Sequence, residues 1–395
     1  MLRGREKKQE DIRRASIQPG RHIFIFGDRG VGKTSLAQTT AYEHHPSETE
    51  PIFLGCDASS TFYSMAFDLC SRISQIDPAI SKQTSSTKGG FNWGISGERQ
   101  MSIERTKSSE PKSINEVIDT IKWTLKGNKK PHVVVIDEFE RINDQDERSL
   151  FADFIKQISD QSISLKLIFC GVGTAVSDLI DSHHSCYRYL TAIELERLGF
   201  PSRFAILDGA SAALGISVES NSRYRIAMIS DGFPHYVHLL TEKLLWAVYD
   251  DAVEIKTTKP KHYIEAIKAA VLDIEPRLKT IYEKATNKYG DGYEDILWAI
   301  ADHYELKRRS LDIFDSYRHI CSLRKVEALT REKFNARINA LKKPSHGSIL
   351  KASRQGWYEF SEPVVRGYVR LRAEEMGIEL GSEHPLQHKI KITTS

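Results

Sequence analysis

Phe24-Ile25-Phe26-Gly27-Asp28-Arg29-Gly30-Val31-Gly32-Lys33-Thr34-Ser35 is the stretch that decides the fold. It follows the pattern G-x-x-x-x-G-K-[ST], in which glycines between a strand and a helix let backbone N–H groups surround a phosphate. The alternative is a glycine turn that fits the pattern by chance. The apolar run before the loop and the helical pattern after it favour the phosphate loop. The residues expected to bind a nucleotide are Gly27, Asp28, Arg29, Gly30, Val31, Gly32, Lys33, Thr34 and Ser35, with Lys33 at the β- and γ-phosphates and the Thr34 hydroxyl on Mg²⁺.

A second motif, His132-Val133-Val134-Val135-Ile136-Asp137-Glu138, ends an apolar β-branched run with two carboxylates. Such a run is typical of a strand buried on both faces of a parallel sheet, and ligands bind at the carboxyl ends of these strands. We therefore expect Asp137 to hold Mg²⁺ through water and Glu138 to polarise the water that attacks the γ-phosphate. The alternative is a strand that ends in ordinary solvated acids.

The composition is that of a soluble chain with real cores. The chain has 395 residues, of which 40% are apolar and 28% charged, and its net charge is only +3, so a nucleic-acid surface would be a local patch. Its five cysteines form no C-x-x-C pair, which predicts reduced thiols in the cytosol. The amino terminus lacks the apolar segment of a signal peptide, and no apolar run is long enough to span a membrane. We expect a cytoplasmic protein.

Strands and helices alternate up to about residue 200. Strands are predicted at 51–54, 132–136 and 165–170, with helices between them, so residues 1–200 should form an α/β domain with a parallel sheet in an αβα sandwich. Within it, the Ser-, Lys- and Gly-rich segment 81–112 reads as a basic insert with a β-hairpin around 94–98.

Beyond residue 200 the pattern is helical. An all-helical lid is predicted over 201–286, with one or two helices in 261–286. Three helices and a hairpin over 347–358 then predict a winged-helix domain at 290–376. The polar residues 377–395 are expected to be a flexible tail.

With these motifs, the chain resembles the AAA+ ATPases, and within them the branch of origin-recognition initiators, transposition target selectors and STAND signalling ATPases. The resemblance implies ATP and Mg²⁺ as ligands and assembly into a ring or filament. Arg5, in Gly4-Arg5-Glu6, matches the box beside the nucleotide base. Arg188 matches an arginine finger that acts on a neighbouring subunit, the alternative being an ordinary surface ion pair. Pro234, in Asp231-Gly232-Phe233-Pro234-His235, matches the G-x-P motif of the lid.

Two departures from the family pattern concern the sensors of the γ-phosphate. His235 stands where initiators carry an arginine. The segment that should provide the first sensor has no asparagine and offers Cys170 or Thr174 instead.

Residues 330–354 carry seven Lys or Arg and one acid, which makes a local basic patch. On the helix expected there, asparagines suit base edges and lysine and arginine suit phosphates, while further cations lie on the wing. The alternative is a winged helix that contacts protein. The residues expected to contact DNA are Lys333, Asn335, Arg337, Asn339, Lys343, Lys351 and Arg354.

Two functions remain open. In the first, the chain oligomerises with ATP, binds duplex DNA and recruits or regulates a separate partner protein. In the second, it is a STAND-like signalling or defence ATPase whose winged helix contacts protein. The basic patch and insert favour the first, and the G-x-P motif favours the second. A third option is an ATPase that serves a separate effector chain. No membrane partner is expected.

Overall fold

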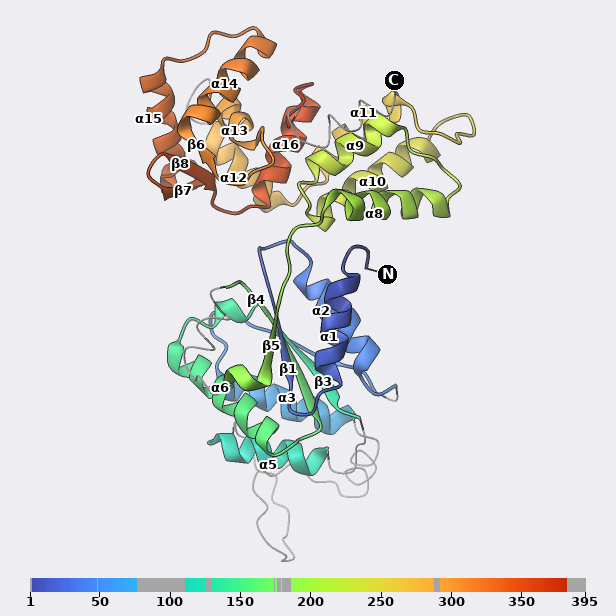
Figure 1. Cartoon of the computed structure of the whole chain (residues 1–395), viewed down its shortest axis with the longest axis vertical. Coiled ribbons are helices and arrows are strands. Elements are labelled where there is room, and N and C mark those ends of the chain that lie inside the picture. Colours follow the sequence, from blue (N-terminus) through green and yellow to red (C-terminus); the bar gives the residue numbers. More distant parts are fainter. Residues whose placement is uncertain are drawn as a thin grey trace, which may run out of the picture. The chain divides into compact units, whose positions relative to one another are not determined.

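The computed structural model describes residues 2–47, 49–76, 111–125, 130–173, 175, 179, 186–287 and 292–381 (Figure 1). These residues divide into two compact units. The first contains Met1–Asp28 and Gly32–Glu196, and the second contains Arg29–Val31 and Arg197–Ser395. The β-hairpin predicted around 94–98 lies outside the described residues, as does most of the insert. Among the helices described, none is long and apolar enough to cross a membrane.

A five-stranded parallel sheet forms the centre of the first unit, in the order β2-β3-β4-β1-β5. Strands β1 to β4 lie where the apolar runs predict them. The fifth strand was not predicted, because Leu190-Thr191-Ala192-Ile193-Glu194 alternates as an edge strand does and lacks a continuous apolar run. The strands are β1 (His22–Phe26), β2 (Ile52–Gly55), β3 (His132–Asp137), β4 (Leu165–Gly171) and β5 (Leu190–Glu194).

Helices cover both faces of this sheet. Helices α1 (Glu6–Ser16) and α2 (Lys33–His44) pack on one face, α1 over β1 and β5 and α2 over β3 and β4. The other face carries α3 (Phe62–Ile76), α5 (Ile114–Thr124) and α6 (Gln145–Asp160), which pack against one another (Figure 1). Apolar residues of this second layer and of the strands form one continuous core. The predicted αβα sandwich is confirmed.

Helices α8 to α12 begin the second unit. They are α8 (Phe200–Ala213), α9 (Ser220–Ile229), α10 (Pro234–Tyr249), α11 (Pro260–Leu272) and α12 (Pro276–Thr286). The predicted helical stretch 261–286 is therefore two helices. Pro276 prevents a single continuous helix, because proline has no N–H to donate inside a helix. It is well suited to the first turn of a helix, and it is the first residue of α12.

The carboxy-terminal elements have the order and pairing that fit a winged helix. Three helices, α13 (Tyr293–Ala301), α14 (Ser310–Arg324) and α15 (Arg331–Leu341), accompany an antiparallel sheet in the order β6-β8-β7. The hairpin strands are β7 (Leu350–Arg354) and β8 (Trp357–Phe360), and β6 is the short segment Arg308–Arg309.

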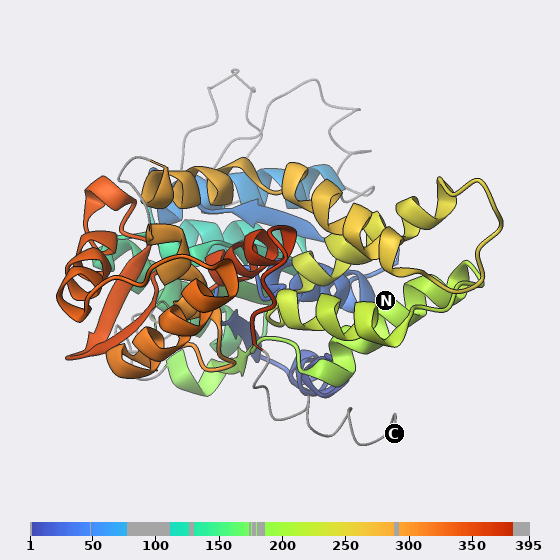
Figure 2. The ribbon, with the colours of Figure 1, turned by 90° about the horizontal axis from the view of Figure 1, so that it is seen from above.

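A last helix, α16 (Val365–Glu375), was not predicted. It packs against α9 and α11 as well as α12 and α13, and Figure 2 shows it (red) between the two groups of helices. Gly367 lets α16 also approach α10, because a Cβ at this position would collide with the Tyr236 ring of α10. Eight of its eleven residues are buried, so its sequence has no polar face that would mark a surface helix.

One buried carboxylate joins the turn between α9 and α10 to α16. Asp231 is 3% exposed and forms ion pairs with Arg197 (2.8 Å), Arg370 (3.4 Å) and Arg366 (3.7 Å). Burial alone would raise the pKa of Asp231, but the surrounding arginines, Arg203 among them, outweigh burial and lower it. Asp231 therefore remains ionised and partly compensates a cluster of buried guanidinium groups.

Candidate nucleotide-binding site

The glycine loop connects β1 to α2 in a conformation that its glycines permit. Gly30 and Gly32 have φ of 85° and 98°, which side chains with a Cβ rarely adopt. Gly32 is the N-cap residue of α2, so Lys33, Thr34 and Ser35 form the first turn. The backbone N–H groups of that turn have no acceptor inside the helix and point outward with the positive end of its dipole. The loop can therefore hold an anion.

Two predicted metal ligands from separate motifs lie in contact. Thr34 Oγ1 donates a hydrogen bond of 2.7 Å to Asp137 Oδ2. Strand β4 lies between β1 and β3, and α2 crosses it because the helix packs over β3 and β4. This crossing brings Thr34 to the carboxyl end of β3. The other oxygen of Asp137 accepts the Glu138 N–H at 2.9 Å, which fixes the orientation of the carboxylate.

The donor set suits Mg²⁺. A hydroxyl and one carboxylate are hard oxygen ligands, and Mg²⁺ usually takes one or two such protein ligands and completes its shell with water and phosphate. Within the described ranges, no group of three or more His, Cys, Asp or Glu side chains could hold a metal alone. The residues present thus fit a cation that arrives with a nucleotide.

Lys33 spans the loop. Its Nζ donates to the carbonyl oxygens of Gly27 (3.0 Å) and Asp28 (2.9 Å). Burial lowers the pKa of Lys33, while the carboxylates of Glu140, Asp137 and Asp28 act in the opposite direction. An ammonium group held by carbonyl oxygens can exchange them for phosphate oxygens, which carry more negative charge.

Glu138 has a left-handed backbone, with φ 55° and ψ 38°, which is uncommon for a residue with a side chain. It precedes the short 3₁₀ helix η1 (Phe139–Arg141). Its carboxylate forms an ion pair of 2.7 Å with Arg141, and both side chains are partly exposed, Glu138 to 40%. The predicted catalytic carboxylate thus lies beside Asp137 and is turned toward Arg141.

Arg188 lies at the amino end of the parallel strands, whereas the glycine loop lies at their carboxyl end. It belongs to the 3₁₀ helix η2 (Cys186–Tyr189), just before β5, whose first residue pairs with the first residue of β1. Five residues of strand span about 16 Å. The Arg188 side chain is exposed and has no ion pair with any part of the chain that the structure describes. It therefore cannot act on the site of its own subunit.

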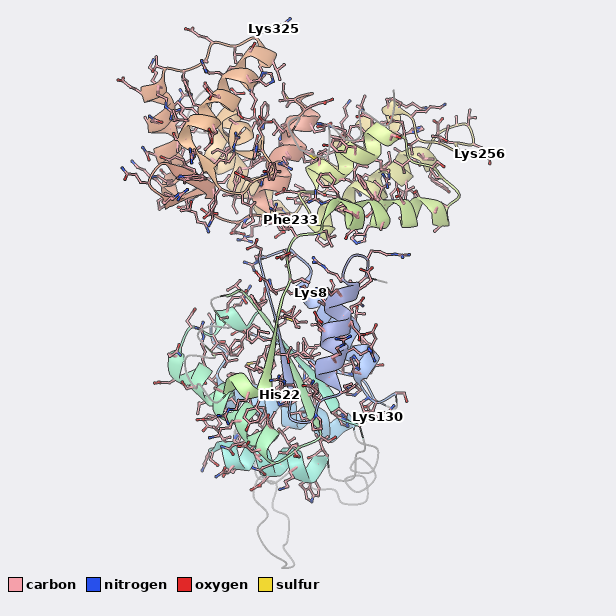
Figure 3. The ribbon with its side chains drawn as sticks, viewed as in Figure 1. Lys8, His22, Lys130, Phe233, Lys256 and Lys325 are labelled. Atoms are coloured by element: carbon pink, nitrogen blue, oxygen red, sulfur yellow. The ribbon has the colours of Figure 1, made fainter. Side chains whose placement is uncertain are left out.

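The two residues predicted to lie beside the base occupy separate units. Arg5 is buried, and burial lowers its pKa, with Glu196 as the opposing charge. Pro234 is the first residue of α10, after Phe233, which Figure 3 labels. Asp231 and Gly232 before it have positive φ, and a Cβ at Gly232 would lie 2.7 Å from the Leu198 carbonyl oxygen. The exposed His235 follows.

The predicted sensors differ in what the structure shows of them. Cys170 is buried in β4 with its Sγ 3.9 Å from the Lys33 carbonyl oxygen, so it lies under the start of α2. Burial first, and then the Asp137 charge, raise the pKa of its thiol. Thr174 lies outside the described residues.

The residues predicted to contact DNA do not all have exposed side chains. On α15, Lys333 and Asn339 are exposed, and Lys343 follows the helix and is exposed as well. Asn335 accepts a hydrogen bond from Ser310 (3.4 Å), and Arg337 is half-buried over the Tyr293 ring (5.2 Å).

On the hairpin, the predicted cations of β7 are exposed. Lys351 lies 3.7 Å from Glu359, and Arg354 stacks on Trp357 (4.1 Å). Arg309 covers the same ring at 5.1 Å. The exposed basic surface therefore lies on one side of α15 and along β7.

Sequence reasoning missed Glu140 and Arg141, the third and fourth residues after Asp137. Both were hidden in Asp137-Glu138-Phe139-Glu140-Arg141, where only the first two acids fit the motif. The signal that could have found them is Phe139, an apolar residue between two acids. Its burial requires the chain to turn tightly at the end of the strand.

Comparison with known proteins agrees with the fold of the first unit. Residues 16–178 match the family model described as an AAA domain. These residues belong to an AAA domain. This confirms the predicted AAA+ fold, and the glycine loop, Asp137 and Glu138 all lie within the matched AAA domain. No curated protein matches the chain.

Several solved structures resemble the chain at low identity. Cdc6p from Pyrobaculum aerophilum is 15% identical with a TM-score of 0.42, and 95% of each chain is covered. Aeropyrum pernix Orc1 in complex with DNA is 14% identical, with a TM-score of 0.45 over 99% of this chain and 95% of that one. The Thermotoga maritima RuvB Holliday junction branch migration motor is 13% identical, with a TM-score of 0.44 over 96% of each. Likenesses of this size establish no shared activity.

Proposed function

We propose that the chain binds ATP with Mg²⁺ at the loop Gly27–Ser35 and hydrolyses it. The observation that carries this proposal is the hydrogen bond of 2.7 Å between Thr34 Oγ1 and Asp137 Oδ2, which joins the loop to the acid-ended strand. A glycine turn that fits the pattern by chance would not be expected to bring the Thr34 hydroxyl to the Asp137 carboxylate.

The residues of the site have separate roles in this proposal. Lys33 leaves the carbonyls of Gly27 and Asp28 for the β- and γ-phosphates, and the N–H groups of the first turn of α2 take the remaining phosphate charge. Glu138 leaves Arg141 and polarises the attacking water. When bound, Mg²⁺ neutralises phosphate charge as the terminal phosphoryl group is transferred.

Hydrolysis would require assembly. Arg188 lies at the amino end of its own sheet, away from the glycine loop. The guanidinium that stabilises transition-state charge would therefore be the Arg188 of a neighbouring subunit. An exposed arginine without an ion pair in the described part of the chain suits such a role. The assembly would be a homo-oligomer, as a ring or a filament.

Duplex DNA is the macromolecular ligand that the exposed basic surface of the second unit supports best. Lys333, Lys343, Lys351 and Arg354 offer cations for phosphates, and Asn339 is the asparagine left exposed for a base edge. The DNA-bound oligomer would recruit or regulate a separate partner protein. The cytoplasm is the compartment that fits these ligands.

A signalling or defence switch of the STAND type is the second candidate. It is favoured by Pro234 at the first position of α10 after a strained Asp231-Gly232 turn, and by α16, which ties the lid helices to α12 and α13. In this function the winged helix would contact protein.

Calorimetric titration with ATP and Mg²⁺ tests the proposed site. Lys33→Ala removes the cation of the loop and should weaken ATP binding about 10- to 100-fold, as expected for the loss of a charge-assisted hydrogen bond. Lys156→Ala, an exposed lysine on α6, is the matched control and should bind as the wild type does. Equal affinity in the wild type and Lys33→Ala would contradict the proposal.

A further inference from the structure

The turn after Asp137 directs four consecutive side chains to different surroundings. In a 3₁₀ helix successive side chains are about 120° apart, and positions i and i+3 coincide. Glu138 and Arg141 share one direction and form their ion pair there. Phe139 is fully buried and packs edge-on against Phe24 (5.9 Å) and Phe169 (5.2 Å). Phe139 thereby fixes the rotation of the turn, and Glu140 must take the third direction.

The charge of Glu140 acts on the predicted nucleotide site. Among the carboxylates, Glu140 has the largest influence on the pKa of Lys33, ahead of Asp137 and Asp28. It also acts on Cys56, which follows β2, and on Cys170 in β4, the two thiols next to Asp137. The carboxylate with the largest charge effect on Lys33 is thus one that the sequence motif does not include.

Glu140 is also incompletely satisfied within the protein. Its Oε2 atom is buried and has no hydrogen-bond partner in the part of the chain that the structure describes. A buried carboxylate oxygen without a donor is costly, because it has lost water and gained nothing in return. Phe139 already anchors the turn, so the fold itself gives no reason for an acid here. A ligand or its bound water would supply the missing donor.

We propose that Glu140 is a positioning residue of the ATP site, whose carboxylate accepts hydrogen bonds from water bound to Mg²⁺. This inference rests on the proposed function. Mg²⁺ keeps several water molecules when it binds to protein and phosphate, and these waters are strong donors to a carboxylate. Glu140 would then strengthen the binding of Mg²⁺–ATP and oppose the binding of ATP without the cation, because two negative charges repel each other.

The test compares the affinity for a fluorescent ATP analogue in Mg²⁺ and in EDTA, without reference to turnover. The wild type should bind more tightly with Mg²⁺, and Glu140→Gln should reduce the ratio of the two dissociation constants about five- to tenfold, the size of one charge–charge interaction across water. Glu140→Asp keeps the charge and should retain the ratio within about twofold. Glu43→Gln removes an exposed charge from α2 and should leave the ratio unchanged.

The variants separate a positioning role from a structural one. A structural role requires the shape, so Glu140→Asp would be the more damaging change, whereas a role toward Mg²⁺ makes Glu140→Gln the more damaging. An unchanged ratio in Glu140→Gln, equal losses in both variants, or a Glu140→Gln protein that does not fold would overturn the assignment of Glu140 alone. A wild-type protein that binds the analogue in neither buffer would instead overturn the proposed function.

Discussion

The buried carboxylate of Asp231 makes a quantitative prediction about the second unit. Asp231→Asn keeps the shape of the side chain and removes its charge. The ion pairs at 2.8 Å with Arg197 and at 3.4 Å with Arg370 would then lack their anion, while Arg366 and Arg370 of α16 remain buried. Removing one partner of a buried pair costs about 3–5 kcal/mol, because the other charge is left uncompensated. We expect a loss of this size in the free energy of unfolding.

Urea unfolding followed by tryptophan fluorescence measures this loss. Asp208→Asn is the control, because Asp208 pairs with Arg223 at 2.6 Å with both side chains partly exposed, and its loss should cost about 1 kcal/mol. Adding Arg366→Met to Asp231→Asn removes one surplus cation and should restore part of the stability. If Asp231→Asn costs no more than Asp208→Asn, the buried cluster does not hold α16 to the turn between α9 and α10.

Three other predictions concern pH, assembly and DNA. Burial, together with Lys166, lowers the pKa of His22 to about 3, whereas the unfolded chain titrates near 6.5, so only the unfolded state gains a proton as the pH falls. Between pH 7 and pH 5 the wild type should therefore lose about 2 kcal/mol more stability in urea than His22→Gln, and equal losses would show that His22 (labelled in Figure 3) is not the cause. Arg188→Ala should hydrolyse ATP slowly but regain activity when mixed with Glu138→Gln, since mixed interfaces contain an intact Arg188 and an intact Glu138; normal oligomers without rescue would argue against action in trans. Replacing Lys333 and Lys343 by alanine should flatten the slope of log affinity for duplex DNA against log salt by about two, and a protein that binds no duplex at low salt with ATP would favour the signalling function.

The sequence predicts the first unit well because its signals are local. A glycine loop requires positive φ, an apolar β-branched run requires burial on two faces, and Asp137 follows from its place at the end of such a run. Thr34 and Asp137 are 103 residues apart, yet the parallel sheet alone is enough to bring their motifs to one edge.

What could not be predicted depends on packing between distant segments. Helix α16 buries two arginines beside its apolar residues. Their partners are Asp231 and the carbonyl oxygens of Met228, Ala301 and His303, which no periodicity reveals. The role proposed for Glu140 depends on the packing of Phe139, which fixes the rotation of the turn.

On α15, a helical wheel shows Asn335 and Arg337 as surface residues. It cannot show that Ser310 and Tyr293 occupy their side chains. Side-chain partners of this kind come from tertiary contacts, so a pattern within one helix does not determine them.

Binding and turnover measured together in Glu138→Gln test the central claim most directly. The amide keeps the shape of the side chain but can neither accept a proton nor polarise water as a carboxylate does. ATP binding with Mg²⁺ should stay within a fewfold of the wild type, while hydrolysis should fall about 100- to 10,000-fold. Asp146→Asn, which removes an exposed charge from α6, should change neither quantity. Hydrolysis at the wild-type rate in Glu138→Gln, with ATP bound normally, would contradict the account of the site.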